Sequence, residues 1–408
     1  MSIWEENPQL ATKVETKKIF TKLKGLDSSN MLDAIVEMPK QIEAALKASK
    51  NYNEGEIPID TSHVHLLGLG GSAIAGDVLN DILTPSKKIS VHYGTLPPRD
   101  KRGVIVTSYS GDTLEIVKLA HRVTGGLKAN VFITSGGKLA HLGWEWSLPV
   151  WRMPLGYQPR AAIGWSLGLL VATMVRWRIL NPAVQDRLKL AAERLSASLA
   201  EDEVFAHPLV RAALPIAKEV KKRNVIVLHS LSTTGAARRM VSQLNENAKH
   251  PAFALVMPEG LHNSIEGIAG GKPDDWMMIF LADQNDPDHL REGMANSAEM
   301  LTARGFKCVA IPSAGNDQYE LTLSRLFLAD FISILLAGIK GIDPTPIPAI
   351  SELKAMIPQE VEEELEDDDS SVEESDGTDA PERAEESDGS DAPEGADESK
   401  EADELDAK

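Results

Sequence analysis

Glu246 and His262 are the residues in this chain whose types and spacing most directly suggest chemistry. A helix is expected over 235–248, where apolar side chains recur every four positions, and Glu246 lies in its last turn. A carboxylate there faces the negative end of the helix dipole, which costs a few tenths to about 1 kcal/mol unless a cation compensates. Pro251 ends the helix, and a short strand over 252–256 delivers His262 to a loop. Each residue alone is more often an ordinary surface side chain, but together they suggest an acid/base pair.

Two hydroxyl-rich loops each lie between an expected strand and an expected helix. The first contains Gly71 and Ser72, and Ser72 is predicted to cap the helix that follows. The second contains Ser108, Ser110 and Thr113. Helix N-termini with hydroxyls and free backbone N–H groups bind phosphate without a fixed positive charge. Ordinary capping by serine and threonine is the alternative for either loop alone, whereas two such loops in neighbouring units favour an anion site.

A dinucleotide site is a weaker interpretation of the same glycines. The spacing Gly68-x-Gly70-x-x is followed by Ala73 instead of a third glycine, and the second strand, which ends near Tyr93, offers no acidic residue for a ribose. No nicotinamide cofactor and no metal are therefore expected. Arg160 precedes an apolar helix and is a candidate for binding an oxyanion, with a surface arginine as the alternative.

The elements that must position these residues alternate between strands and helices in two similar halves. This pattern predicts an α/β fold with two mainly parallel sheets flanked by helices. The expected organisation is a helical arm at 1–55, a first domain with the phosphate loops at 56–180, a helical connector at 181–215, a second domain with the acid/base residues at 216–340, an active-site segment at 341–357 and a disordered acidic tail at 358–408.

Charge is distributed very unevenly along the chain. Of 61 acidic residues and 42 lysines and arginines, residues 358–408 hold 24 and 3, so the rest of the chain is close to neutral. A twelve-residue repeat over 373–396 has almost no apolar content and predicts disorder. No basic stripe for nucleic acid is found, and no signal peptide or bilayer-spanning segment is expected. The single cysteine, Cys308, excludes an intramolecular disulfide and fits a cytoplasmic location.

In their order along the chain, these motifs resemble the bifunctional phosphoglucose/phosphomannose isomerases, which belong to the sugar isomerase (SIS) superfamily. The resemblance covers about residues 1–357 and rests on six short motifs, of which Asn-Glu-Asn-Ala-Lys is the most specific. They are Gly70-Gly71-Ser72, Ser108-Tyr-Ser110-Gly-x-Thr113, Pro159-Arg160, Asn245-Glu246-Asn247-Ala248-Lys249, His262-Asn263 and Asp343-Pro344-Thr345.

The resemblance implies two SIS-type domains, a sugar-phosphate substrate and specific roles for these residues. Ser72, Ser108, Ser110 and Thr113 would hold the 6-phosphate. Arg160 would stabilise an enediolate, and Glu246 would move a proton between C1 and C2. His262 would assist ring opening from the partner subunit, which implies a homodimer, and Lys354 is the best match to a lysine that reaches the site from near the C-terminus.

Three positions depart from the family pattern. Asp112 stands where asparagine is usual, and it would bring negative charge to a phosphate loop unless it points away or is paired. Ser264 and Ile268 replace a usual glutamate and tryptophan. Two alternatives stay open: another SIS isomerase, acting on a hexulose 6-phosphate or an amino-sugar phosphate, and a sugar-phosphate sensor that does no chemistry.

Overall fold

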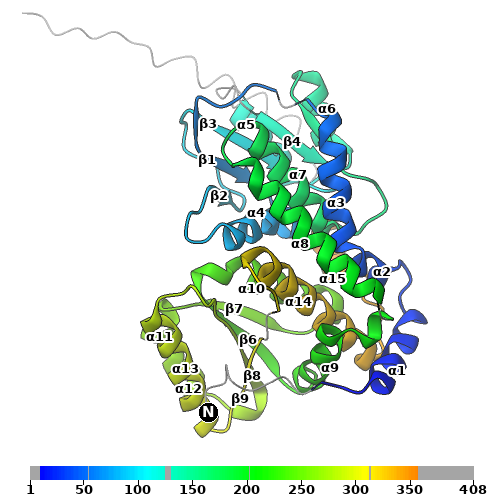
Figure 1. Ribbon diagram of the computed structural model, residues 1–408, viewed down its shortest axis with the longest axis vertical. Coiled ribbons are helices and arrows are strands. Elements are labelled where there is room, and N and C mark those ends of the chain that lie inside the picture. The colour runs from blue at the N-terminus through cyan, green and yellow to red at the C-terminus, as the bar shows by residue number, and fades with distance from the viewer. Residues whose placement is uncertain (1–9, 54, 125–129, 202, 312–313, 357–408) are drawn as a thin grey trace, which may run out of the picture. The chain divides into compact units, whose positions relative to one another are not determined.

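The architecture is that of a computed structural model (Figure 1), which describes residues 10–53, 55–124, 130–201, 203–311 and 314–356. All of them belong to one compact unit, residues 1–361. The predicted disordered tail, 358–408, lies outside the described residues.

The first sheet has five strands in the order β2-β1-β3-β4-β5, and all of its strand pairs are parallel. Its strands are β1 Asp60–Leu67, β2 Ile89–His92, β3 Arg102–Thr107, β4 Asn130–Thr134 and β5 Val150–Arg152. After the neighbouring strands β1 and β3 the chain continues into α4 (Gly70–Ile82) and α5 (Leu114–Thr124), which pack on opposite faces of the sheet. Parallel sheets bind ligands in the crevice at the carboxyl ends of such a strand pair.

The second sheet has four parallel strands in the order β7-β6-β8-β9. Its strands are β6 Asn224–His229, β7 Ala252–Val256, β8 Trp276–Leu281 and β9 Lys307–Ala310. Two parallel sheets flanked by helices confirm the predicted fold class.

Fifteen α-helices and five short 3-10 helices connect and cover the strands within the described residues. The α-helices are α1 Lys13–Lys24, α2 Met31–Val36, α3 Met38–Ala48, α4 Gly70–Ile82, α5 Leu114–Thr124, α6 Gly137–Glu145, α7 Ile163–Arg176, α8 Pro182–Glu201, α9 Pro208–Val220, α10 Thr234–Ala248, α11 Glu259–His262, α12 Ser264–Ala269, α13 Asp288–Ala303, α14 Gln318–Lys340 and α15 Pro348–Met356. The 3-10 helices are η1 Ser49–Asn51, η2 Pro159–Ala161, η3 Val204–Ala206, η4 Leu231–Thr233 and η5 Pro273–Asp275.

A continuous apolar core joins the inner faces of both sheets through α3, α4, α7, α9, α10 and α14. Smaller clusters lie under α5 and α6 on the first sheet and under α13 on the second. Helix α14 is long and apolar enough to cross a membrane, but 94% of its apolar window is buried inside the protein. Packing within the core therefore accounts for its composition.

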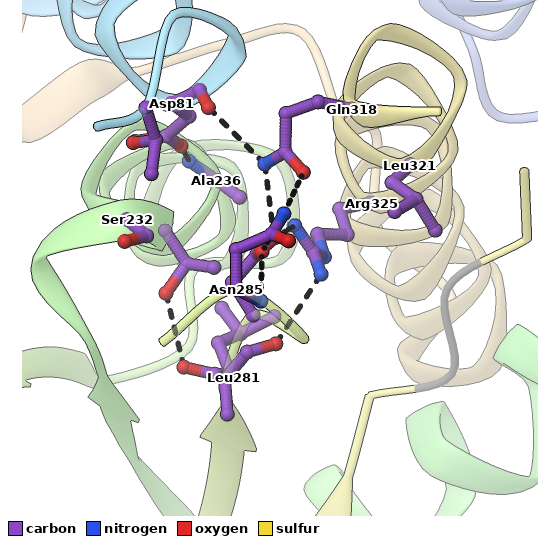
Figure 2. A network of polar contacts seen from close by, with 12 residues as sticks. Asp81, Ser232, Ala236, Leu281, Asn285, Gln318, Leu321 and Arg325 are labelled. Atoms are coloured by element: carbon purple, nitrogen blue, oxygen red, sulfur yellow. Dashed lines mark hydrogen bonds and ion pairs between the residues drawn. The ribbon is translucent and has the colours of Figure 1, made fainter. Parts of the chain in front are cut away.

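Helices α4 and α10 cross closely. Because α4 follows β1 and α10 follows β6, this crossing joins the first sheet to the second. A side chain at Gly235 would place its Cβ only 2.4 Å from the Val78 backbone nitrogen, so glycine permits the contact. At the same crossing Asp81 accepts a hydrogen bond of 3.0 Å from the Ala236 backbone N–H. Figure 2 shows Asp81 facing the start of α10, with Gln318 and Arg325 of α14 reaching toward the end of β8.

Several segments differ from their sequence prediction. The expected loop that carries His262 is a short helix, α11, because the residues after Pro258 form one helical turn before Asn263 leaves the helical region. Helix α6 and strand β5, which lie between the strand at 130–134 and the loop before Arg160, were not predicted from the sequence.

Candidate active site

The two hydroxyl loops meet at the carboxyl ends of β1 and β3, as their neighbouring places in the sheet require. The Oγ of Ser72 accepts a hydrogen bond of 3.2 Å from the Tyr109 N–H, which joins the first loop to the second. Within the second loop the hydroxyls of Ser108 and Thr113 lie 3.0 Å apart. The Oγ of Ser110 accepts from the Asp112 N–H, and Ser110 is exposed at the rim. The fold thus gathers the hydroxyls that the sequence singled out.

Ser72 is not the cap of its helix, which corrects the sequence prediction. Helix α4 begins at Gly70, two residues earlier, and Leu69 occupies the capping position without a side-chain hydrogen bond. Gly70 adopts a positive φ of 54°, which glycine tolerates at the sharp turn between β1 and α4. The first N–H groups of α4 therefore have no side-chain cap from Leu69, and such groups are the usual donors to a bound anion.

Asp112 points away from the hydroxyls and is paired. Its Oδ1 accepts a hydrogen bond of 2.9 Å from the Lys138 N–H in the first turn of α6. Gly111 makes this close approach possible, since it has a φ of 76° and a Cβ there would lie 1.8 Å from the Gly136 carbonyl oxygen. The positive end of the α6 dipole offsets the charge of Asp112. This departure from the family pattern consequently leaves the second hydroxyl loop without an unpaired carboxylate at Asp112.

Arg160 lies in η2, and its side chain is only 2% exposed. Its Nε donates to the Asn247 Oδ1 at 2.7 Å, and its Nη2 donates to the carbonyl oxygens of Pro344 and Thr345 at 2.9 and 2.8 Å. Burial lowers the pKa of the guanidinium, and the charge of Glu246 partly offsets this effect. Arg160 also adjoins the phosphate loop, because a Cβ at Gly71 would lie 3.2 Å from its Cα.

Glu246 is 23% exposed in the last turn of α10, and its Oε2 lies 3.4 Å from the Arg160 Nη1. Cations compensate the unfavourable end of the helix dipole. Besides Arg160, the Nζ of Lys340 donates to the carbonyl oxygens of Ala248 and Lys249 at 2.7 and 3.0 Å. Glu246 therefore lies beside a buried arginine at a helix end that cations compensate.

Lys249 is a site residue that the sequence reading missed. Its Nζ donates to the carbonyl oxygens of Asp343 and Pro344 at 2.9 and 3.0 Å, so it holds the same segment that Arg160 holds. Burial lowers the pKa of Lys249, and the nearby charge of Arg160 lowers it further. The signal was present in the sequence, since Lys249 ends the Asn-Glu-Asn-Ala-Lys motif.

The roles predicted for His262 and Lys354 stay predictions. His262 is exposed at the end of α11, and Lys354 is exposed on α15. Neither makes a hydrogen bond to Arg160 or Glu246 among the described residues. The described residues also contain no group of three or more His, Cys, Asp and Glu side chains arranged to hold a metal ion.

Comparison with known proteins gives a consistent result. The family model of the bacterial phospho-glucose isomerase C-terminal SIS domain matches residues 210–357. A bifunctional phosphoglucose/phosphomannose isomerase of Caldicellulosiruptor bescii is 29% identical over 337 residues, which are 79% of this chain and 98% of the relative. Over most of its length the chain is similar to bifunctional phosphoglucose/phosphomannose isomerases. It is an isomerase enzyme.

Other relatives show how widely the SIS fold is shared. A D-glucosamine-6-phosphate 4-epimerase of Sulfolobus acidocaldarius is 30% identical over 217 residues, covering 52% of this chain and 66% of the epimerase. Among solved structures, a hypothetical protein of Thermus thermophilus superposes with a TM-score of 0.63 at 14% identity, covering 84% of this chain and 94% of that protein. At that identity the structural likeness supports the fold alone.

Proposed function

We propose that this isomerase interconverts fructose 6-phosphate with glucose 6-phosphate and mannose 6-phosphate by proton transfer through an enediolate. The observation that carries the proposal is the contact between Glu246 and Arg160, a base beside a buried donor. Aldose–ketose exchange needs a base to move one proton and a positive group where enediolate charge develops. No cofactor is invoked in this mechanism.

The first sheet would hold the phosphate of the substrate. The hydroxyls of Ser72, Ser108, Ser110 and Thr113, together with the first N–H groups of α4 including that of Gly71, supply neutral donors for its oxygens. Binding energy from this unreactive end can be used to orient the reacting carbons. Because Gly71 packs against Arg160, the phosphate and the reacting end would be fixed by one continuous piece of structure.

Proton transfer would use Glu246, which α10 of the second sheet brings to the site. Glu246 would remove the proton from C2 of the aldose and return it to C1 of the ketose. The Nε and Nη2 of Arg160 already donate to protein acceptors, so Nη1, with its longer contact to Glu246, is the nitrogen available to a substrate oxygen. The positive charge at Nη1 would stabilise the enediolate as it forms.

Ring opening would use His262 from a second copy of the chain in a homodimer. The exposed position of His262 on α11 fits a residue that acts on a neighbouring subunit. Apolar side chains lie on the same sheet edge, where Phe253 of the edge strand β7 is 56% exposed. Lys354 is proposed to reach the site from α15. A cytoplasmic location is also proposed, which the single cysteine fits.

The test is an assay on fructose 6-phosphate, without added metal or nucleotide, that measures glucose 6-phosphate and mannose 6-phosphate separately. Formation of both products is expected. Glu246→Gln is expected to abolish turnover while binding of a phosphate ester survives, because it removes the base and leaves the phosphate loops intact. Near-normal activity of this variant would exclude Glu246 as the base.

Two other functions would give different results in assays of turnover and of deuterium exchange. An epimerase or isomerase for an amino-sugar phosphate, which the Sulfolobus relative makes a specific alternative, would turn over that substrate and not fructose 6-phosphate. A sensor would bind sugar phosphates without washing solvent deuterium into C1 or C2. Deuterium exchange therefore separates an enzyme from a binding protein.

A further inference from the structure

A fully buried carboxylate, Asp330, interrupts the apolar helix α14 in the middle of the core. Its two oxygens accept from the Nε and Nη2 of Arg239 at 2.8 and 2.9 Å. The side-chain amide of Gln243 also donates to Asp330, at 2.8 Å. A buried ion pair is weak evidence for a contribution to stability, because desolvation cancels much of the attraction. The positions to which these partners lead are more informative.

One branch leads from Asp330 to the backbone of Arg160. Arg239 uses its remaining terminal nitrogen, Nη1, to donate to the Arg160 carbonyl oxygen. Arg239 is itself 1% exposed, so its guanidinium is fixed by protein contacts. The carboxylate thus orients an arginine that fixes the turn carrying the proposed enediolate donor.

A second branch leads from the same turn of α14 to the side chain of Arg160. The Ser333 hydroxyl donates to the Asp330 carbonyl oxygen at 2.7 Å and accepts from the Asn247 Nδ2 at 3.0 Å. Asn247 in turn accepts from the Arg160 Nε at 2.7 Å. Asn247 is fully buried and directly follows Glu246 in α10, so this branch also fixes the turn that presents the base.

We propose that Asp330 and Ser333 of α14 are positioning residues that hold Arg160 and Glu246 in register for catalysis through these two branches. The inference rests on the proposed function, because it assumes that Arg160 acts on the enediolate. Neither Asp330 nor Ser333 lies where a substrate would reach it. Preorganised donors of this kind stabilise a transition state only when their own supports are fixed.

The charge of Asp330 has a second part in this arrangement. Arg239 and Arg160 are two buried cations, and Arg239 donates to the Arg160 backbone carbonyl oxygen. Arg239 pairs with Asp330, and Arg160 pairs with Glu246. Without Asp330, Arg239 would be a buried cation without its carboxylate partner, and Glu246 and Asp343 would be the acidic groups left near Arg160. A shift of Glu246 toward Arg239 would move the base away from the substrate.

The chain offers a closely matched control, a second buried carboxylate whose partners lie on the same helix, α14. Asp283, at the end of β8, accepts from Arg325 at 2.8 Å and from the side-chain amide of Gln318 at 2.9 Å. This buried pair therefore has the same composition as the Asp330 pair, and Figure 2 shows Gln318 and Arg325 of α14 within it. Through Gln318 the contacts of Asp283 extend to the Asp81 carbonyl oxygen, but among the described residues neither Asp283 nor its partners donate to or accept from Arg160.

The first experiment compares Asp330→Asn with Asp283→Asn at equal folded fractions. Asp330→Asn is expected to lower kcat roughly a hundredfold, which is the effect of misplacing catalytic groups by about 1 Å, and to change KM by less than about threefold. Asp283→Asn is expected to lose stability but to keep kcat within about threefold, because within the described chain no hydrogen bond of this pair is made to Arg160. Equal losses of kcat in both variants would overturn the proposal.

Ser333→Ala tests the second branch with little risk to folding, since it removes one hydroxyl. It is expected to lower kcat about tenfold with an unchanged KM, because loss of one supporting hydrogen bond frees the amide of Asn247. Thr322→Val, which alters a buried hydroxyl of α14 that has no hydrogen-bond partner, is the matched control and should have no effect. Normal kcat in Ser333→Ala would contradict this branch even if Asp330→Asn fails to fold.

A binding measurement separates this proposal from the proposed function. A five-carbon phosphorylated hydroxamate mimics the enediolate, whereas sorbitol 6-phosphate presents the phosphate without it. Asp330→Asn should weaken binding of the hydroxamate roughly a hundredfold and leave sorbitol 6-phosphate within about threefold. If the unchanged protein binds the hydroxamate but does not isomerise fructose 6-phosphate, the proposed function fails, and the hydroxamate affinities of the two proteins still test whether Asp330 positions Arg160. Equal affinity of both proteins for the hydroxamate would overturn the inference.

Discussion

Asp112 shows how a single residue can depart from a family pattern without loss of the site. Its carboxylate accepts from the first turn of α6, so Asp112→Asn should leave KM for fructose 6-phosphate within about twofold. The free energy of unfolding should fall by a few tenths to about 1 kcal/mol, because asparagine keeps the hydrogen bond and loses the charge–dipole term. Steady-state kinetics and urea denaturation measure both. A strongly lowered KM would mean that Asp112 repels the phosphate.

Asp81 predicts a pH dependence of stability. Burial between α4 and α10 raises its pKa well above the ordinary value, although the Gly235 and Ala236 amides act in the opposite direction. An unfolded aspartate titrates near pH 4 (about 3.9), so above that pH the folded protein retains a proton that the unfolded chain has released. The free energy of unfolding contributed by Asp81 is fully present below pH about 4 and decreases as pH rises toward the folded pKa.

Asp81→Asn removes this titration and serves as the reference. The difference in unfolding free energy, unchanged protein minus variant, should decrease as pH rises above about 4 when urea denaturation is repeated at each pH. A difference that is constant with pH would show that Asp81 is ionised in the folded protein.

At the residue scale, the sequence indicated the reacting groups better than their supports. Glu246 and Arg160 stand in recognisable motifs, and the structure places them in contact. Arg239 and Asp330 carry no such signal, because an arginine in a polar helix and one acid in an apolar helix do not show their pairing. Only the packing of α10 against α14 reveals it.

At the scale of elements, the crossing of α4 and α10 is the contact most sensitive to volume. Gly235→Ala would place a methyl group 2.4 Å from the Val78 backbone nitrogen, which must separate the helices. We expect a loss of about 1–3 kcal/mol in unfolding free energy, with reduced kcat because Glu246 lies on the displaced helix. Gly267→Ala in α12 meets no atom within 4 Å and is the control, expected to be neutral or slightly stabilising. Equal stability of both variants would contradict the close crossing.

Four strands were the elements most accurately predicted. The bounds of β4, β6, β7 and β8 agree with the sequence prediction, because the strands of a parallel sheet are short apolar runs with turn residues at both ends. This holds even for the edge strand β7, where Phe253 is exposed. Helix α6 and strand β5 were missed, since their glycines and tryptophans give no clear period. Ser72 was misplaced as a cap because the sequence does not show that Gly70 starts the helix.

At the scale of the whole molecule, the described residues do not include a contact that joins His262 to the other proposed acid/base residues. Arg160 and Glu246 lie together, while His262 is exposed on α11 without a hydrogen bond to either of them. A single copy would therefore have the proton-transfer pair without the group proposed for ring opening. A second copy would supply that group if the two subunits exchange histidines across a two-fold interface.

Mixing two inactive variants tests this exchange directly. Glu246→Gln and His262→Ala should each have little activity alone, because every homodimeric site lacks one group. Random reassociation gives half heterodimers, in which one of the two sites combines an intact Glu246 with the partner's intact histidine. The mixture should therefore recover about a quarter of the unchanged activity, as expected for a symmetric dimer whose sites are shared between subunits. A mixture that stays inactive, although mass spectrometry detects heterodimers, would show that His262 acts within its own chain. An active His262→Ala variant would show that His262 is not needed.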